Sequence, residues 1–309
     1  MSIGLCCQYI APVEKRGGKI HWENITYEKS LKFGSFKDNK YTNQHILDVY
    51  YHNLSNLLII LKRIHSEGFK SFRISSNILP LIDAVDVSLL EDKKLLSLLS
   101  QIGKFILSSN MRLTVHPDQF CVISSVSEKV INNSFKILEN HAWIFDKLGL
   151  PQTPYYAINI HGGKKNQEKT LINSINKLPN NVKNRLTLEN DERCYSVKDL
   201  FFIYKETGVP IVFDSHHHTF NDSKISSKEA MLMSIETWRN YKPLTHLSNT
   251  EPEFINGSFN NRRKHSNYVH YIPEHQLEAN NKNQIDIDFE FKGKNIAIIK
   301  SIKEFGVIL

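Results

Sequence analysis

Short runs of β-branched residues alternate along the chain with longer segments in which apolar residues recur every three or four positions. The short runs predict buried strands and the longer segments predict amphipathic helices. We predict eight strands, at residues 3–7, 71–75, 111–116, 156–161, 185–189, 210–214, 243–247 and 285–290. Helical periodicity occupies nearly every interval between them, at residues 43–67, 88–108, 128–149, 167–178, 196–207, 226–239 and 294–305.

This alternation is typical of βα units on a parallel sheet. Eight such units predict a (β/α)₈ TIM barrel, an α/β fold that forms one domain over residues 1–309. The alternative is a doubly wound open sheet, which would normally carry a glycine fingerprint after its first strand, and the residues after Cys7 contain none. Residues 11–42 are rich in Gly, Lys and Asn, so we expect a long loop there.

The composition is that of a globular protein, with 40% hydrophobic and 23% charged residues, which excludes a disordered or fibrous chain. No apolar run approaches the ~18 residues that a membrane-spanning helix needs. The N-terminal residues lack the basic lead and the long apolar stretch of a secretory signal. Four cysteines, two of them the adjacent Cys6 and Cys7, make a poor disulfide framework. We therefore expect a cytoplasmic protein with no membrane association.

Side chains that can bind metals stand at the ends of the predicted strands. The carboxyl ends of the strands of a parallel barrel converge on one face, so these side chains should meet. The strand-end set comprises His116, His161, Glu189, Asp214, His246 and Glu290. Asp214 is followed by His216, His217 and His218, of which His217 is best placed to curl back onto the same face. His265 lies in the loop between the last two strands.

These eight residues form a nitrogen and oxygen donor set that suits Zn²⁺, Mn²⁺ or Fe²⁺. One ion takes three or four protein ligands, so the set predicts two or three ions. Ions about 3.5–4 Å apart can generate a nucleophile from water and neutralise a phosphoryl transition state. Glu189, on a central strand, is the predicted bridging carboxylate. A lone histidine at a strand end is more often a hydrogen-bonded core residue, so the prediction rests on the whole set.

Basic residues cluster in two loops that we expect on the same face. They are Lys164, Lys165 and Lys169 after His161, and Arg262, Arg263 and Lys264 before His265. The chain carries a net charge of +7, which suits a polyanionic partner. A run of charge is usually only a solvated surface, but beside a hydrolytic metal site it favours contacts with a DNA phosphate backbone.

The ordered motifs of the chain resemble those of the UV damage endonuclease family from about residue 3 to residue 305. They read RISS at 73–76, HPDQF at 116–120, HGG at 161–163, LENDE at 188–192, FDSHHH at 213–218, THLS at 245–248, RKHSNY at 263–268 and DFEFKGK near 288. The resemblance implies a TIM barrel related to endonuclease IV with divalent ions, most commonly manganese, while zinc, cobalt or magnesium are also possible. It implies the eight residues above as ligands, with the six strand-end residues as the catalytic set.

The resemblance also implies the substrate. Family members nick duplex DNA immediately 5′ of cyclobutane pyrimidine dimers and 6-4 photoproducts, leaving a 3′-hydroxyl and a 5′-phosphate. Gln119 and Phe120 occupy the positions of a wedge that enters the helix at the lesion, where poor stacking makes opening less costly. The alternative for Phe120 is packing in the top of the barrel.

Three departures from the family pattern bear on the site. Asp118 stands where members carry glycine, and it places a negative charge beside the wedge. Leu5 and Tyr9 replace a tyrosine and an asparagine, which removes the lesion contacts of those side chains. Leu244 replaces a lysine that some members carboxylate as an extra ligand, so we expect no modified lysine and a weaker or more hydrated ion site.

We expect a monomer that acts on damaged double-stranded DNA. Three other functions are compatible with parts of the pattern. The nearest is an abasic-site endonuclease of the endonuclease IV type. A sugar isomerase would leave the basic loops unexplained, and a non-catalytic protein that binds damaged DNA would leave the full ligand set unexplained.

Overall fold

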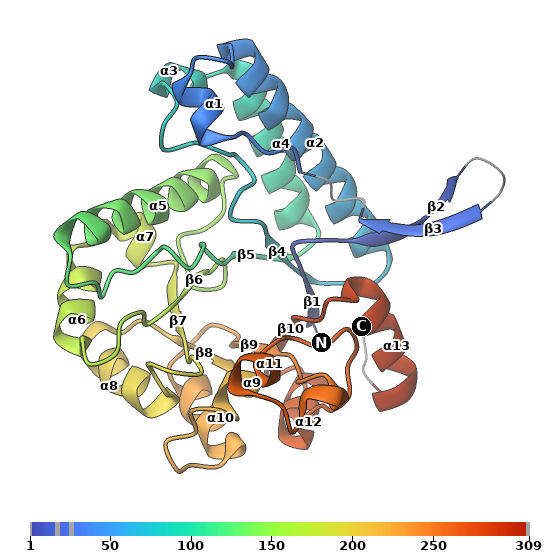
Figure 1. The fold of residues 1–309 in the computed structure, drawn as a ribbon, viewed down its shortest axis with the longest axis vertical. Helices are drawn as coiled ribbons and strands as arrows, with labels where there is room; N and C mark the ends of the chain where they lie inside the picture. The colour runs from blue at the N-terminus through green and yellow to red at the C-terminus, as the bar shows by residue number, and fades with distance from the viewer. Residues whose placement is uncertain (1, 16–18, 25–27, 307–309) are drawn as a thin grey trace.

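A computed structural model of the chain describes residues 2–15, 19–24 and 28–306. Eight parallel strands close into a barrel in the order β1-β10-β9-β8-β7-β6-β5-β4 (Figure 1). Their bounds are β1 Ser2–Cys6, β4 Ser71–Ile74, β5 Arg112–Val115, β6 Ile158–His161, β7 Leu186–Glu189, β8 Ile211–Asp214, β9 Leu244–Leu247 and β10 Asp286–Phe289. The ring is closed because β1 pairs in parallel with both β4 and β10. The predicted TIM barrel is confirmed, and the doubly wound sheet is wrong.

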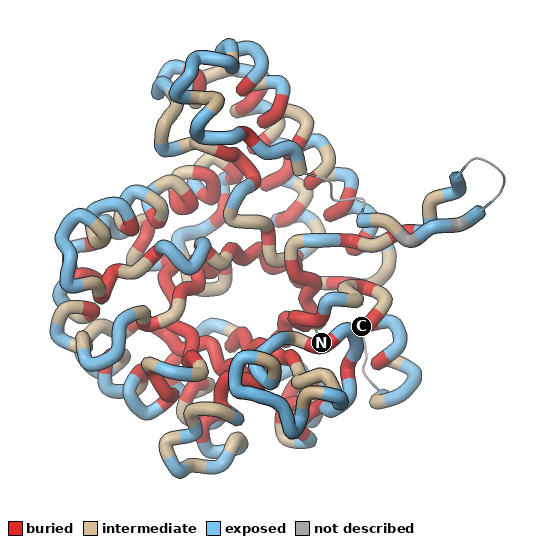
Figure 2. Tube along the Cα trace, viewed as in Figure 1, coloured by how far each residue is buried: buried red, intermediate tan, exposed pale blue. Residues whose placement is uncertain are grey.

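Helices surround this barrel and link its strands (Figure 1). The longer ones are α2 Asn43–Ser66, α4 Lys93–Ser108, α5 Glu128–Lys147, α6 Glu168–Lys177, α8 Val197–Thr207, α10 Ser227–Glu236, α12 Glu274–Asn281 and α13 Lys294–Phe305. The short ones are α1 Phe33–Lys37, α3 Val87–Leu90, α7 Asn180–Lys183, α9 Ser215–His218, α11 Phe259–Arg262 and the 3₁₀ turn Pro252–Phe254. Buried positions follow the strands and the inner faces of the helices (Figure 2). Within the described part of the chain, no helix is long and apolar enough to cross a membrane.

The predicted loop at residues 11–42 is wrong in two places. Strands β2 Ile10–Lys15 and β3 Lys19–Asn24 form an antiparallel hairpin that projects from the barrel (Figure 1), and α1 follows it. The Asn295 side chain holds the start of β2, with 2.8 Å from the Ile10 N–H to Oδ1 and 2.9 Å from Nδ2 to the Ile10 carbonyl. Such a long-range contact leaves no signal in a Lys- and Gly-rich segment. Residues 16–18 and 25–27 lie outside the described residues.

The helix predicted at 88–108 is two helices. Helix α3 ends at Leu90 and α4 begins at Lys93, because the Asp92 carboxylate accepts a hydrogen bond of 2.8 Å from the Leu95 N–H and caps a new helix there. Apolar residues keep the helical spacing across residues 91 and 92, so the periodicity alone predicted one continuous helix. Helices α7 and α12 were not predicted, because they are short or weakly amphipathic.

The N-terminal end of the barrel is closed by a buried arginine. Arg112 lies 2.8 Å from Asp286, and its Nε donates to the Tyr155 carbonyl at 3.0 Å. Its guanidinium also stacks on the Tyr155 and Trp238 rings, with 4.2 Å and 5.4 Å to their centroids. The buried charges at this end are therefore paired within the protein. The candidate functional side chains lie at the opposite end of the barrel.

Candidate metal centre

The carboxyl ends of the strands bring seven of the eight predicted ligands together. They form three overlapping groups in which the ligand atoms lie within 4.8 Å of one another. The groups are His116–His161–Glu189, Glu189–Asp214–His217 and Asp214–His246–Glu290. Glu189 and Asp214 each belong to two groups, so each has the position of a carboxylate between neighbouring ions.

Glu189 lies at the centre of this cluster and is almost completely buried. Its Oε2 is 3.3 Å from His116 Nε2, and its Oε1 is 3.4 Å from His217 Nδ1 and 3.2 Å from His246 Nδ1. One carboxylate thus faces three imidazoles that belong to three different strand ends. This is the geometry expected of a bridging ligand.

Several buried polar atoms of the cluster have no hydrogen-bond partner within the described residues. They are His161 Nδ1, Asp214 Oδ2 and His246 Nε2. An unsatisfied buried polar atom normally costs about 1–3 kcal/mol, so a concentration of them at one place calls for an occupant. All are nitrogen or carboxylate oxygen donors of the kind that Zn²⁺, Mn²⁺ and similar ions take. The residues present therefore fit divalent ions.

The electrostatics of the cluster point the same way. Burial lowers the pKa of His246, but Glu189 and Glu290 raise it more, to about 9. Burial raises the pKa of Glu189, but His246 and His161 lower it further, so that its pKa lies well below the ordinary range. Burial likewise lowers the pKa of His217, but Asp214 and Glu189 raise it well above its ordinary value. Protons on His217 and His246 thus balance the charge of the carboxylates in the metal-free protein, and divalent cations would replace them.

Two buried polar residues that are not predicted ligands orient Glu189 through hydrogen bonds. Asn159 Nδ2 donates to Glu189 Oε2 at 2.5 Å, and Thr187 Oγ1 donates to Asn159 Oδ1 at 2.8 Å. Because Thr187 sets which end of the Asn159 amide faces Glu189, the bridging carboxylate has one orientation. Sequence reasoning missed both residues, although they lie on the inward face of their strands two positions before His161 and Glu189.

The FDSHHH motif folds into the short helix α9. The Asp214 carboxylate accepts a hydrogen bond of 2.7 Å from the His217 N–H and caps this helix, which turns His217 back toward Glu189. Asn190 locks the segment, since its side chain bonds both the N–H and the carbonyl of Asp214, at 2.8 Å and 2.9 Å. Of the three histidines in this run, His217 is the one whose ring belongs to a ligand group, while its role as a ligand stays a prediction.

The other histidines near the centre take different places. His265, a predicted ligand, belongs to none of the three groups, and its Nδ1 is 3.7 Å from Glu290 Oε2 at the rim. The His216 ring contacts Phe220 and His265, with centroids 5.1 Å and 6.0 Å away. His218 Nε2 lies 3.1 Å from the Ile225 carbonyl, which places that ring away from the cluster.

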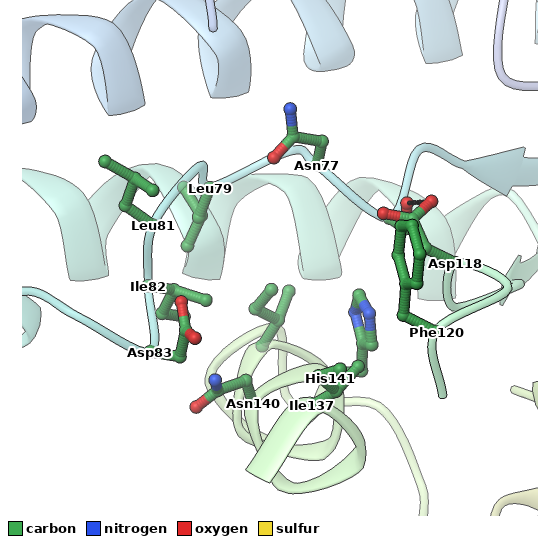
Figure 3. Close-up of a pocket in the computed structure, with 12 residues that line it drawn as sticks. Asn77, Leu79, Leu81, Ile82, Asp83, Asp118, Phe120, Ile137, Asn140 and His141 are labelled. Carbon is green, nitrogen blue, oxygen red and sulfur yellow. Dashed lines mark hydrogen bonds between the residues drawn. The ribbon is translucent and has the colours of Figure 1, made fainter. Parts of the chain in front are cut away.

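The predicted wedge stands clear of the barrel. Phe120 is 74% exposed and Gln119 is also exposed, so the alternative in which Phe120 packs in the barrel top is wrong. Phe120 stands at one edge of a cleft of about 200 Å³, with Leu81 and Ile82 across from it and His141 of α5 below (Figure 3). Burial lowers the pKa of His141 to about 4, so its ring is neutral at pH 7.

The departures from the family pattern have local explanations. Asp118 does not take a left-handed backbone, and its carboxylate accepts a hydrogen bond of 2.7 Å from Ser76 Oγ. Tyr9 is buried and its hydroxyl donates to Glu67, outside the metal cluster. Leu244 packs inside the barrel against Val212 and Trp238 and offers no ligand atom.

All six predicted basic residues are exposed. Arg263 forms an ion pair with Glu192, and the Arg262 guanidinium lies 5.3 Å from the Phe220 ring centroid. The Lys264 ammonium donates to the Asn261 side chain at 3.0 Å. The remaining three are Lys164, Lys165 and Lys169 on the loop and helix after β6. Both groups therefore lie in segments that follow the carboxyl ends of barrel strands, as the predicted ligands do.

Known proteins are similar to this chain over most of its length. A family model described as UV-endonuclease UvdE matches residues 20–308. The UV DNA damage endonuclease of Nostoc sp. is 37% identical over 290 residues, which cover 89% of this chain and 86% of that protein. The crystal structure of SacUVDE has a TM-score of 0.80 at 29% identity and covers 100% of both chains.

A more distant likeness supports the fold alone. Endonuclease IV from Thermus thermophilus has a TM-score of 0.54 at 12% identity and covers 80% of this chain and 91% of its own. The family model, by contrast, covers nearly the whole chain and agrees with the ordered motifs. The chain therefore belongs to the UV-endonuclease UvdE family and is an endonuclease, a phosphodiester hydrolase.

Proposed function

We propose that this protein nicks duplex DNA immediately 5′ of UV photolesions, both cyclobutane pyrimidine dimers and 6-4 photoproducts, and leaves a 3′-hydroxyl and a 5′-phosphate. It would act as a single-domain monomer with two or three divalent ions, preferably manganese, with zinc, cobalt or magnesium as substitutes. The observation that carries the proposal is the set of three overlapping ligand groups that share Glu189 and Asp214 beneath a basic rim.

The members of the ligand groups would have different roles in binding the ions. Glu189 and Asp214 would each lie between two ions, while the histidines of each group complete the coordination. His265 is the additional ligand that we propose from the rim. When bound, such ions supply a nucleophile from water at neutral pH and neutralise the charge of an in-line phosphoryl displacement. Asn159 and Asn190 keep Glu189 and the Asp214 segment in place during the reaction.

The surrounding surface would place the DNA. Lysines and arginines of the two basic loops would contact phosphates on either side of the cluster, a sequence-independent role. They are Lys164, Lys165, Lys169, Arg262, Arg263 and Lys264. Phe120 would fill the stack that the lesion leaves, and Gln119 would hydrogen-bond the bases opposite. Because a photodimer is poorly stacked, opening the helix there costs less than the few kcal/mol of an intact step.

The test uses three end-labelled duplexes that are identical except for one thymine dimer, one abasic site or no damage. Each is incubated with the protein and Mn²⁺, with and without a chelator. We expect chelator-sensitive nicking at the phosphodiester 5′ of the dimer. Cleavage of the abasic duplex alone would assign the protein the alternative substrate. Tight lesion-selective binding without cleavage under any ion would leave only a binding function, and conversion of an aldose by the same preparation would indicate an isomerase.

The wedge assignment has its own prediction. Replacing Gln119 and Phe120 by alanine should lower nicking of the dimer duplex about 10- to 100-fold, since one base–aromatic stacking contact is worth about 1–3 kcal/mol. The double variant should bind Mn²⁺ as the wild type does, because neither residue belongs to a ligand group. The exposed Phe202 on α8, replaced by alanine, is a matched control for loss of a surface aromatic ring. Unchanged dimer nicking by the double variant would remove these residues from lesion recognition.

A further inference from the structure

The RISS segment lies against the metal cluster, but the proposed function gives its arginine no role. Arg73 is the third residue of β4, and its side chain points into the barrel with 13% of its surface exposed. Its Nη1 donates to Glu290 Oε1 in a close ion pair. A buried arginine carries a large desolvation cost, so its place beside a predicted metal ligand needs a reason.

The layer of side chains just below the ligands is built around this guanidinium. Asp288, two residues before Glu290, is fully buried and accepts a hydrogen bond of 3.0 Å from Ser71 Oγ. Gly4 makes room for that carboxylate, because a Cβ at this position would overlap it. Asp288 and Glu290 both interact electrostatically with the Arg73 guanidinium and favour its charged form. Burial raises the pKa of Glu290, but Arg73, ahead of His246, lowers it below its ordinary value.

The two oxygens of Glu290 have different surroundings. Oε1 receives the Arg73 guanidinium and lies 3.1 Å from His246 Nδ1. Oε2 lies on the other side, 3.7 Å from His265 Nδ1. His265 is the one predicted ligand outside the three groups, so the orientation of Glu290 decides whether an oxygen is available beside it.

We propose that Arg73 is a positioning residue of the metal centre, which holds Glu290 Oε1 and thereby presents Oε2 to an ion shared with His265. An arginine suits this role because its charge is permanent and its guanidinium is a rigid plane with fixed donor directions. The pair keeps Glu290 in place before ions arrive. The inference rests on the proposed function only in requiring divalent ions at this site.

The test measures Mn²⁺ binding to the full-length, metal-stripped protein, by the loss of the free-ion EPR signal during titration. Arg73→Met should weaken the weakest-bound Mn²⁺ about 10- to 100-fold, the usual effect of removing a residue that orients a ligand. Arg73→Lys should recover part of this affinity, because it restores the positive charge but not the planar guanidinium group. Arg63→Met is the matched control, since Arg63 also pairs with a glutamate, Glu67, but lies on α2.

A double-mutant cycle shows whether Arg73 acts through Glu290. If it does, the variant with both Arg73→Met and Glu290→Gln binds Mn²⁺ as weakly as Glu290→Gln alone. Additive losses, or wild-type affinity in Arg73→Met, would overturn the inference. If Arg73→Met does not fold, as judged by circular dichroism, the same cycle is run with Arg73→Lys. Failure of the proposed function would give a different result. In that case Glu189→Gln would bind Mn²⁺ as the wild type does, or the wild type would bind no Mn²⁺ at all.

Discussion

The two ends of the barrel differ in whether their buried charged and polar side chains have partners within the protein. At the N-terminal end, Arg112 has Asp286 and backbone carbonyls as partners, and aromatic rings cover it. At the C-terminal end, atoms of His161, Asp214 and His246 are buried without a partner among the described residues. Both ends are built from inward-facing side chains of the same strands: Arg112 and Asp286 start β5 and β10, and His116 and Glu290 directly follow them. At the first end protein groups pair with one another, whereas the second end presents donor atoms that divalent ions would satisfy.

This difference separates stability from function within one fold. In barrels of this kind, residues at the N-terminal end serve folding and residues at the C-terminal end serve catalysis. A substitution at the first end should therefore change the free energy of unfolding and leave metal binding intact. One at the second end should do the reverse.

The largest expected effect comes from the bridging carboxylate. Glu189→Gln should abolish nicking of the dimer duplex and weaken Mn²⁺ binding by at least about 100-fold, because two ligand groups lose a shared negative charge. Nicking is measured on the end-labelled duplex and binding by EPR titration. Binding of the damaged duplex should persist, since the basic loops are unchanged. A variant that still nicks at the wild-type rate would falsify the metal assignment.

At the opposite end, Arg112→Met should lower the free energy of unfolding by about 3–5 kcal/mol, because it leaves the buried Asp286 with only Lys242 as an ion-pair partner among the described residues. Denaturant unfolding with and without Mn²⁺ measures this. The folded variant should bind Mn²⁺ with wild-type affinity. A loss of Mn²⁺ affinity as large as that of Glu189→Gln would erase the distinction between the two ends.

The smallest expected effect is a pH dependence of the metal-free protein. The pKa of His246 is raised from 6.5 to about 9 in the folded state. Its stabilising contribution is therefore complete below pH 6.5 and is lost as pH rises through 9. Between pH 6 and pH 8 this one group should cost about 2 kcal/mol of unfolding free energy.

Ions should reverse that trend, since they displace the His246 proton and bind more tightly as pH rises. Denaturant unfolding at pH 6 and pH 8, with Mn²⁺ or with chelator, compares the two cases. Arg63→Met, outside the cluster, should show the wild-type pH dependence. Equal slopes with and without Mn²⁺ would contradict the exchange of protons for ions at His246.

The ligand cluster was predictable because a barrel converts position along a strand into position in space. His116 and Glu290 are 174 residues apart in the chain, yet each directly follows a strand of the same closed ring, so a pattern of strand ends sufficed. His217 was predictable for a local reason, since a residue three positions past a helix-capping aspartate turns back toward it.

The supporting residues were not predictable in the same way. Arg73 and Asn159 look like ordinary strand residues, and only the closure of the barrel shows what each one faces. The β2–β3 hairpin was missed because it projects from the barrel and β2 is largely exposed, so it lacks the apolar pattern of a buried strand. Sequence pattern thus identifies groups that carry chemistry, whereas the residues that orient them depend on contacts between distant strands.

The close approach of Gly4 and Asp288 has a consequence for how the family can vary. The carboxylate occupies the volume that any side chain at position 4 would need. A lineage that gains even an alanine at that position must move the acid at position 288 out of its place beside Ser71 or replace it. Substitutions at these two positions should therefore be inherited together, although 283 residues separate them in the chain.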